Sequence, residues 1–218
     1  MTTATNPVAG PRQLQFGPLQ IEYDERVLAP RPWTFAQSSW AAELAPTLPA
    51  GPILELCAGA GHIGLAAAVL ADRDLIQVDA NPAAVAYAIA NAARSGWSER
   101  AEARAGQLQH ALAAGESFPL IIADPPYLPS ADVKQWPDDP VLAIDGGEDG
   151  LALVRDCLAV AAAHLAPGGE LLLQVAGPQQ DRQVAALLAA SPAWGLRRIE
   201  VRVVDDARAI TRIARNAC

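Results

Sequence analysis

Short apolar runs alternate with alanine-rich segments from residue 52 to about residue 190. Continuous runs of Leu, Ile and Val are typical of strands that are buried on both faces of a parallel sheet. We predict five such strands, at Ile53–Cys57, Leu75–Asp79, Ala101–Ala105, Leu120–Ala123 and Glu170–Val175. The helices predicted after them cover His62–Ala71, Pro82–Arg94, Gln107–Ala114, Leu151–Leu165 and Gln180–Ala190. Repeated strand–helix units predict an α/β fold, a Rossmann-like sheet with helices on both faces.

The N-terminal part of the chain departs from this pattern. Met1–Arg12 is polar and contains Pro and Gly, which predicts a mobile tail. Two short runs, Leu14–Phe16 and Leu19–Tyr23, predict a small hairpin. Thr34 is expected to be the N-cap of a helix over Phe35–Leu48.

At the other end, Arg198–Val204 and Ala209–Ala214 alternate with a period of two, which predicts an antiparallel pair that closes the sheet. No internal repeat and no second apolar core is visible in the sequence. We therefore expect two parts, a tail and hairpin over residues 1–32 and one large domain over residues 33–218.

Composition narrows the class of protein. With 218 residues, 51% hydrophobic and 18% charged, the chain is that of a globular domain. No apolar run approaches the roughly 20 residues that span a bilayer, and residues 1–18 lack the pattern of a signal peptide, so we expect a cytoplasmic protein without a membrane partner. The net charge of −8 disfavours a general binder of nucleic acid, although a local basic patch of arginines stays open.

Neither cysteines nor histidines suggest a metal site. Cys57, Cys157 and Cys218 are scattered and have neither disulfide-framework nor metal-ligand spacing. The three histidines, His62, His110 and His164, share no spacing either, and we interpret them as surface or cap residues. We expect no metal.

Candidate chemistry begins with Asp124-Pro-Pro-Tyr127, which follows a predicted buried strand. Two consecutive prolines cannot continue a central strand, so they form a stiff turn at a carboxyl strand end, where α/β sheets bind ligands. A planar NH₂ group is a poor nucleophile, but the Asp124 side chain and the Pro125 carbonyl can accept its two hydrogens. Stacked on Tyr127 beside Pro126, such a group would be aimed at an electrophile. The alternative is a rigid turn without chemistry.

The second candidate is the small-residue loop from Glu55 to Gly61. Small residues after a strand let a ligand approach the backbone, and Asp79 at the end of the next strand can accept hydrogen bonds from ribose hydroxyls. Cys57 and Ala58 break the dinucleotide fingerprint, which favours a nucleoside cofactor without pyrophosphate, namely S-adenosylmethionine. The alternative is a tight turn and a helix-capping Asp. The candidate cofactor residues are Glu55, Cys57, Ala58, Gly59, Gly61, Asp79 and Ala80, with Glu55 equally plausible as an ordinary strand-end acid.

Together, Glu55–Gly61, Val78–Pro82 and Asp124–Tyr127 resemble class I S-adenosylmethionine-dependent methyltransferases that act on nitrogen. The segments Asp145-Gly-Gly-Glu-Asp-Gly-Leu151 and Leu165–Gly169 narrow the resemblance to the HemK-type protein-glutamine methyltransferases. Val27–Pro32 is similar to a segment of that family, and Gln179 to the glutamine after its fifth strand. The resemblance covers about residues 14–215.

The resemblance implies a seven-stranded sheet of order 3-2-1-4-5-7-6 with the last strand antiparallel. It also implies S-adenosyl-L-methionine as cofactor, with adenine contacts from Gln107 and Leu108 and a further contact from Asp124. The substrate would be a protein carrying a glutamine, such as a translation release factor, held by the Asp124–Tyr127 turn and by Arg31.

Three departures from the family bear on the substrate. The family usually has Asn at position 124 and an acidic residue at position 107, and its N-terminal helical domain has no counterpart in the residues before Arg31. Three hypotheses therefore stay open: a protein-amide methyltransferase, an amino-methyltransferase of nucleic acid or a small metabolite, and a cofactor-binding module without catalysis. In the loop at 145–151, Glu148 and Asp149 are interpreted as acids at the start of a helix, where its dipole favours them.

Overall fold

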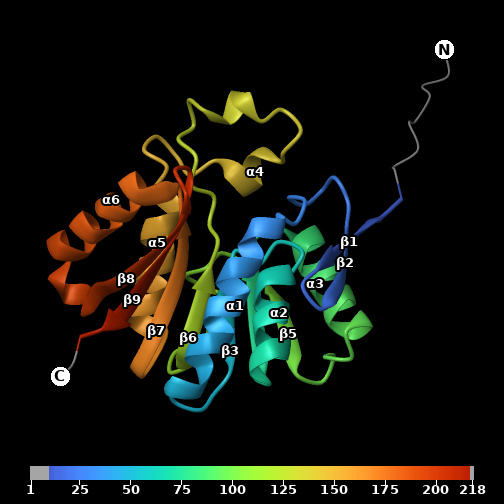
Figure 1. Ribbon diagram of the computed structural model, residues 1–218, viewed down its shortest axis with the longest axis horizontal. Helices are drawn as coiled ribbons and strands as arrows, with labels where there is room; N and C mark the ends of the chain where they lie inside the picture. The colour runs from blue at the N-terminus through green and yellow to red at the C-terminus, as the bar shows by residue number, and fades with distance from the viewer. Residues whose placement is uncertain (1–9, 217–218) are drawn as a thin grey trace.

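A seven-stranded mixed sheet runs through the molecule in the order β5-β4-β3-β6-β7-β9-β8 (Figure 1). The computed structural model describes residues 10–216, so the predicted tail up to residue 9 and Cys218 lie outside the described part. The parallel strands are β3 (Ile53–Leu56), β4 (Leu75–Asp79), β5 (Ala101–Ala105), β6 (Phe118–Ala123) and β7 (Leu165–Val175). The last two, β8 (Leu196–Asp205) and β9 (Arg208–Arg215), form an antiparallel hairpin whose second strand pairs antiparallel with β7. Counted along the main sheet, this is the predicted order 3-2-1-4-5-7-6, which is confirmed.

Helices cover both faces of the sheet, as predicted (Figure 1). One face carries α1 (Phe35–Leu44), α2 (His62–Ala71) and α3 (Pro82–Arg94), and the other carries α5 (Ala152–His164) and α6 (Gly177–Ala190). The short helix α4 (Val141–Ile144) stands above the carboxyl ends of the strands. Short 3-10 turns lie at Pro32–Thr34, Ala45–Thr47, Val133–Gln135 and Pro192–Trp194. Within residues 10–216, no helix is both long and apolar enough to cross a membrane.

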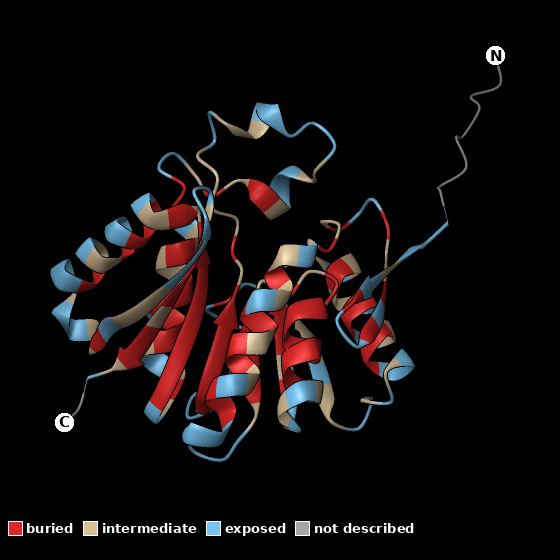
Figure 2. Ribbon diagram, viewed as in Figure 1, coloured by how far each residue is buried: buried red, intermediate tan, exposed pale blue. Residues whose placement is uncertain are grey.

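The central strands are buried on both faces because their side chains alternate between two cores (Figure 2). In β6, Leu120 and Ile122 belong to the core under α1 and α2, whereas Ile121 and Ala123 belong to the core under α5. A fully buried Leu or Ile contributes about 1.5–3 kcal/mol to folding. This two-sided burial fixes where β6 ends, and therefore where Asp124 begins.

The N-terminal hairpin packs on the domain, as predicted. Its strands are β1 (Arg12–Phe16) and β2 (Leu19–Tyr23), and Phe16 and Ile21 are buried in the main core. From α3, the Asn91 side chain accepts a hydrogen bond from the Glu22 amide (2.8 Å) and donates one to the Glu22 carbonyl (3.0 Å). These contacts tie the hairpin to α3.

Thr34 occupies the predicted N-cap position of α1, but its side chain makes no cap, because its hydroxyl donates to the Arg31 carbonyl at 2.8 Å. Two predictions of local structure are wrong. Helix α1 ends at Leu44, before a 3-10 turn, and not at Leu48. The helix predicted over Gln107–Ala114 is a series of turns. A segment this short gains little from its own hydrogen bonds, and in it only Leu108 is buried.

Candidate active site

A cavity of about 810 Å³ opens at the carboxyl ends of β3, β4 and β6. Most of the predicted site residues line it: Arg31, Cys57, Ala58, Gly59, Asp79, Ala80, Gln107, Leu108, Asp124 and Pro126. Four predicted residues, Glu55, Gly61, Pro125 and Tyr127, do not line the cavity. The structure thus brings both sequence motifs to one cavity, although some residues of each motif do not line it.

The loop after β3 turns back on itself through three left-handed residues. Cys57 has φ +58°, Gly59 has φ +54° and Gly61 has φ +77°. A Cβ on Gly61 would lie 2.6 Å from the Gln77 side chain and 2.9 Å from Ala88, so only glycine lets α2 start this close to α3. A Cβ on Gly59 would meet nothing within 4 Å. The backbone at Gly59 is therefore open to a ligand in the cavity.

Asp79 connects this loop to the next. Its Oδ2 accepts a hydrogen bond from the Gly59 amide, and its Oδ1 accepts one from the Asn81 amide, both at 2.8 Å. Burial raises the pKa of the carboxyl. The cap of α3 is Asn81, whose side chain accepts from the Ala83 amide at 2.9 Å, so Asp79 is not the helix cap. Each Asp79 oxygen keeps a lone pair for a diol.

Glu55 lies beneath the loop. Its carboxyl accepts hydrogen bonds from the Gly64 amide (2.8 Å) and the Gln77 side chain (2.6 Å), and burial raises its pKa to about 8. These bonds join β3 to α2 and β4. The geometry is that of the strand-end acid, the second of the two interpretations given for this residue.

Asp124 extends from the end of β6 into the cavity. Within residues 10–216 its carboxyl group receives no hydrogen bond, and burial raises its pKa to about 7. The carbonyl of the next residue, Pro125, has no hydrogen-bond donor in the same described range. Two consecutive residues at this strand end therefore carry acceptors without a donor in the described range, and an incoming NH₂ group needs two acceptors.

Tyr127 is half-buried behind these acceptors. Burial is the main cause that raises the pKa of its hydroxyl, and the charge of Asp124 raises it further, whereas Arg208 and Arg31 act in the opposite sense. Its backbone carbonyl accepts a hydrogen bond from the Gln180 side chain at 3.1 Å. The turn is therefore fixed through its main chain.

The loop at 145–151 packs against this turn. The Gly146 amide donates to the Leu128 carbonyl at 2.8 Å, and a Cβ on Gly150 would lie 2.5 Å from the Tyr127 carbonyl oxygen. The Asp149 carboxylate accepts from the Leu151 amide at 3.0 Å, at the start of α5, as predicted. The glycines of this loop let its backbone support the Asp124–Tyr127 turn.

Sequence reasoning missed two glutamines that hold the site. Gln180, not Gln179, is buried: it accepts from the Ala176 amide and donates to the carbonyls of Tyr127 and Gly150. On α1, Gln37 donates to the carbonyls of Ala123 and Leu172, both at 3.0 Å, and so fixes the end of β6. Both contacts join residues far apart in the chain, which no local pattern reveals.

The interpretation of His62 as a surface or cap residue is wrong. Its ring is buried at the start of α2, lines the cavity and packs edge-to-face on Phe16 with centroids 4.7 Å apart. Burial lowers its pKa to about 3, so the ring is neutral. The position directly after Gly61, at the start of a helix that faces the cavity, was the available signal.

Arg31 lies at the edge of the cavity and forms an ion pair with Asp139 at 2.6 Å. Asp139 belongs to the long segment between the Asp124–Tyr127 turn and the 145–151 loop. The guanidinium groups of Arg208 and Arg31 both lie over the Trp33 ring, 3.9 Å and 5.8 Å from its centroid. Of these residues, Arg31 lines the cavity and the others connect it to neighbouring segments.

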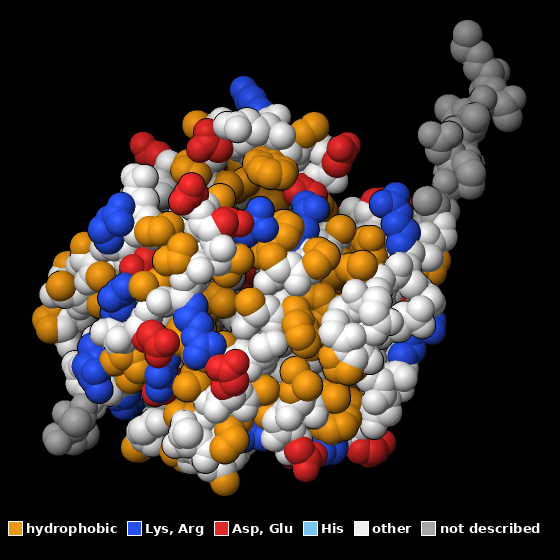
Figure 3. All heavy atoms as spheres, in the orientation of Figure 1, with side chains coloured by type: hydrophobic (Ala, Val, Ile, Leu, Met, Phe, Trp, Pro, Cys, Tyr) orange, Lys and Arg blue, Asp and Glu red, His pale blue; other side chains and the backbone are white. Residues whose placement is uncertain are grey.

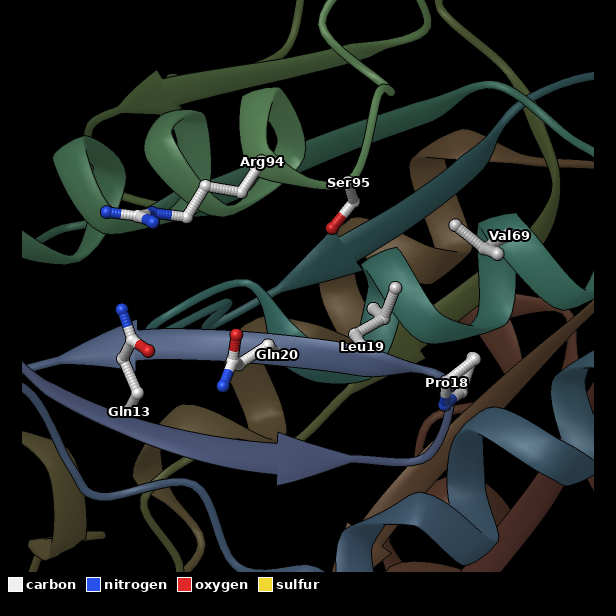
Figure 4. A pocket seen from close by; sticks show the side chains of 7 residues that line it. All are labelled: Gln13, Pro18, Leu19, Gln20, Val69, Arg94 and Ser95. Atoms are coloured by element: carbon white, nitrogen blue, oxygen red, sulfur yellow. The ribbon is translucent and has the colours of Figure 1, made fainter.

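A second hollow, of about 460 Å³, lies between the N-terminal hairpin and the end of α3 (Figure 4). Its wall carries Leu19 of β2, Arg94 and Ser95, and none of the predicted site residues reaches it. We do not assign it to the candidate site.

Comparison with known proteins gives a consistent result. The profile of the "Methyltransferase small domain" family matches residues 39–136. The release factor glutamine methyltransferase of Gloeobacter violaceus is 35% identical over 201 residues, which cover 89% of this chain and 68% of that protein. The ribosomal protein uL3 glutamine methyltransferase of Bordetella pertussis is 34% identical over 148 residues, 65% of this chain and 48% of that protein. Among solved structures, the ribosomal protein L11 methylase from Lactobacillus delbrueckii subsp. bulgaricus has a TM-score of 0.63 at 14% identity, over 89% of this chain and 84% of that one.

The chain spans about two thirds of the length of the release factor methyltransferases that it matches, and about half of the uL3 methyltransferase. The structural neighbour, at 14% identity, supports the fold alone.

Proposed function

The chain belongs to the HemK-type family of S-adenosylmethionine-dependent methyltransferases, and on this premise we propose that it methylates the side-chain amide of a glutamine in a protein. The observation that carries the proposal is the Asp124 carboxyl group, which lines the cavity and receives no hydrogen bond from residues 10–216, followed in the chain by the Pro125 carbonyl, which has no donor in that range either.

The cavity fits the cofactor of this family. S-adenosylmethionine supplies a methyl group on a positively charged sulfur when it is bound. Asp79 keeps free lone pairs for the two ribose hydroxyls, and open space above Gly59 admits a ligand next to the backbone. Gln107 and Leu108 line the side of the cavity where the resemblance places the adenine. When ionised, Asp79 and Asp124 give this space negative charge, and a cationic ligand would in turn favour their ionised forms.

The acceptor side is built for a planar NH₂ group. Asp124 and the Pro125 carbonyl would each accept one hydrogen, and the stiff proline pair would hold them in place, so that the nitrogen is oriented at little entropic cost. An ionised Asp124 would also stabilise the positive charge that develops on nitrogen. Tyr127 would cover the plane of the amide, with its main chain fixed by Gln180.

Support for a protein substrate comes from the relatives, which are named for a release factor and for ribosomal protein uL3. We propose a protein of the translation apparatus as partner, in the cytoplasm. A second candidate is an amino group of a nucleic-acid base or metabolite, and Asp124 in place of the family's usual Asn favours it.

The test is transfer of labelled methyl from S-adenosylmethionine to lysate fractions, with protein and RNA separated afterwards. We expect label in protein, and at most about 1% of that label in the same time with Asp124→Ala. Label confined to RNA or to small molecules would contradict the proposal. An unlabelled lysate, with cofactor binding intact, would indicate a binding module without catalysis.

A further inference from the structure

The segment at residues 128–149, which we call the lid, stands over the cavity and presents an unusual surface. It carries the 3-10 turn Val133–Gln135 and helix α4, and five of its residues after position 140 (Val141, Leu142, Ala143, Asp145 and Gly147) line the cavity. Figure 1 shows it as a separate lobe above the carboxyl edge of the sheet. Its two ends are joined, because the Leu128 amide donates to the Ile144 carbonyl and the Gly146 amide donates to the Leu128 carbonyl.

Exposed apolar side chains concentrate on this lobe. Trp136 is 51% exposed, Val141 is 59% exposed and Leu142 is 69% exposed. These are three of the seven large hydrophobic side chains that are exposed in residues 10–216, and they lie within seven consecutive residues. Grouped exposed apolar side chains mark an interaction site, and this group is continuous with the wall of the cavity.

The charge around this apolar surface is mainly negative. The lid contains six acidic residues and one basic residue, Lys134. Two of the acids, Asp138 and Glu148, are exposed and have no ion-pair partner among residues 10–216. Figure 3 shows acidic side chains around the hydrophobic ones at the top of the molecule. A phosphate backbone would be repelled here, whereas cationic side chains would be attracted.

Arginines near the cavity do not offset this charge. Arg31 is held by Asp139 at 2.6 Å, and the Arg208 guanidinium lies over Trp33 and 3.4 Å from Asp205. Their charges are engaged within the protein. The free charge next to the acceptor side of the cavity is therefore acidic.

We propose that the lid is the docking surface for a basic, partly apolar segment of the protein substrate, flanking the residue that is methylated. This inference rests on the proposed function and gives it a substrate class. Apolar side chains of the segment would cover Trp136, Val141 and Leu142, and its Lys or Arg side chains would meet Asp138 and Glu148. The acids set the choice of partner, and the apolar contacts supply most of the affinity.

Binding of synthetic peptides to the full chain, loaded with S-adenosylhomocysteine, tests the proposal by fluorescence anisotropy. Two peptides share a central glutamine and the same apolar residues, and differ only in flanking Lys or Glu. We expect the Lys peptide to bind at least about 10-fold more tightly at low ionic strength, with a preference that shrinks in about 0.5 M salt. A single-stranded RNA oligonucleotide serves as the competing class of ligand.

Matched variants locate the surface. Asp138→Lys should weaken the Lys peptide about 3–10-fold, and Glu99→Lys, equally exposed but at the opposite end of the sheet, should leave it unchanged. Leu142→Ser should weaken both peptides, whereas Ile89→Ser, 55% exposed on α3, should weaken neither.

Equal affinity for the two peptides, tighter binding of RNA, or equal effects of Asp138→Lys and Glu99→Lys would overturn the proposal. The readout is binding, so it is separate from the reaction. If the Lys peptide binds selectively but its glutamine is not methylated, the docking surface stands and the glutamine assignment fails.

Discussion

The Asp124 carboxyl group faces the cavity and receives no hydrogen bond within the described chain. Burial raises its pKa to about 7. The ionised form is the better acceptor for an incoming N–H. Since the folded pKa is about 7, that form is populated above this pH and lost below it. Asn offers one oxygen acceptor in the same place at every pH.

We therefore predict that Asp124→Asn retains substantial turnover, while Asp124→Ala loses roughly 10²–10³-fold in kcat, the size of removing one preorganised partner of the transition state. The wild-type rate should rise with pH through about 7, and the Asn variant should not. Steady-state rates from pH 6 to 8, with cofactor affinity measured in parallel, check this. An Asn variant as inactive as the Ala variant would mean that the charge itself is required, which counts against an amide acceptor.

Cys57 has an unusual backbone conformation, because its φ of +58° lies in the left-handed region, which disfavours residues with a side chain. Cys57→Gly should keep activity within a few-fold and leave stability within about 1 kcal/mol, since glycine adopts this conformation freely. Cys57→Val should destabilise by about 1–2 kcal/mol, because a β-branched residue is strained there. Chemical denaturation of the two variants provides the comparison. A Gly variant that folds but has no activity would show that the thiol has a role that we do not assign.

At the scale of elements, the 145–151 loop supports the Asp124–Tyr127 turn through positions where a side chain does not fit. Gly150 has φ +72°, and its Cβ would lie 2.5 Å from the Tyr127 carbonyl oxygen. Gly96 has nearly the same φ, +70°, with nothing within 4 Å. Substitutions at Gly150 and at Gly96 therefore separate the effect of backbone strain, which both would have, from displacement of the Asp124–Tyr127 turn, which only Gly150 would cause.

Gly150→Ala should lower kcat about 10–100-fold, because a small displacement of acceptor groups is costly, and should change cofactor affinity less than about twofold. Gly96→Ala should cost only about 1 kcal/mol of stability, as expected for a left-handed residue. Calorimetry with the cofactor and steady-state rates distinguish the two. Equal losses of kcat in both variants would show that the loop does not position the turn.

Most elements follow from local patterns, and the exceptions have a physical reason. The strands Leu75–Asp79 and Ala101–Ala105, and the helices His62–Ala71 and Pro82–Arg94, appear with their predicted bounds. Short strands and alanine-rich helices that alternate along the chain, with Pro82 and Gly61 at the helix starts, are local signals that the sequence contains. For Gln107–Ala114, propensity alone suggested a helix, but the segment buries too little apolar surface to stabilise one.

In the site, too, some residues could be predicted from local sequence and others could not. Gly59, Asp79 and Asp124 lie at strand ends that the sequence marks clearly, so their convergence was predictable from the parallel sheet. Gln37, Gln180 and the pairing of Arg31 with Asp139 connect distant segments, and only the folded structure shows them.

For the whole molecule, buried acids set the dependence of stability on pH. The folded pKa values of Asp124 and Glu55 are raised to about 7 and about 8, and that of Asp79 is also raised. A raised carboxyl pKa gives stability below the unfolded value, near 4, that is lost as pH rises through the folded value. His62, with its pKa lowered to about 3, acts in the opposite sense below about pH 6.5, but it is one group against three.

Carboxyls held by arginines limit stability on the acid side. Asp24, with its pKa lowered to about 2 by Arg26, loses its contribution as pH falls below about 4. We predict maximal stability of the free protein near about pH 5 and a decline toward pH 8. Urea denaturation across this range measures it, with Asp124→Asn expected to flatten the decline. Stability that rises from pH 5 to 8 would contradict the raised pKa values.

In the reaction that we propose, the methyl group goes to the side-chain nitrogen of a glutamine in a protein. Tandem mass spectrometry of the labelled protein, after reaction with purified enzyme and S-adenosylmethionine, tests it most directly. We expect fragment ions that place one methyl group on a glutamine side chain, within a segment rich in basic and apolar residues, and at most about 1% of that product in the same time with Asp124→Ala. A methyl group on a lysine, on a carboxylate or on the chain terminus, or methyl transfer to RNA alone, would contradict it.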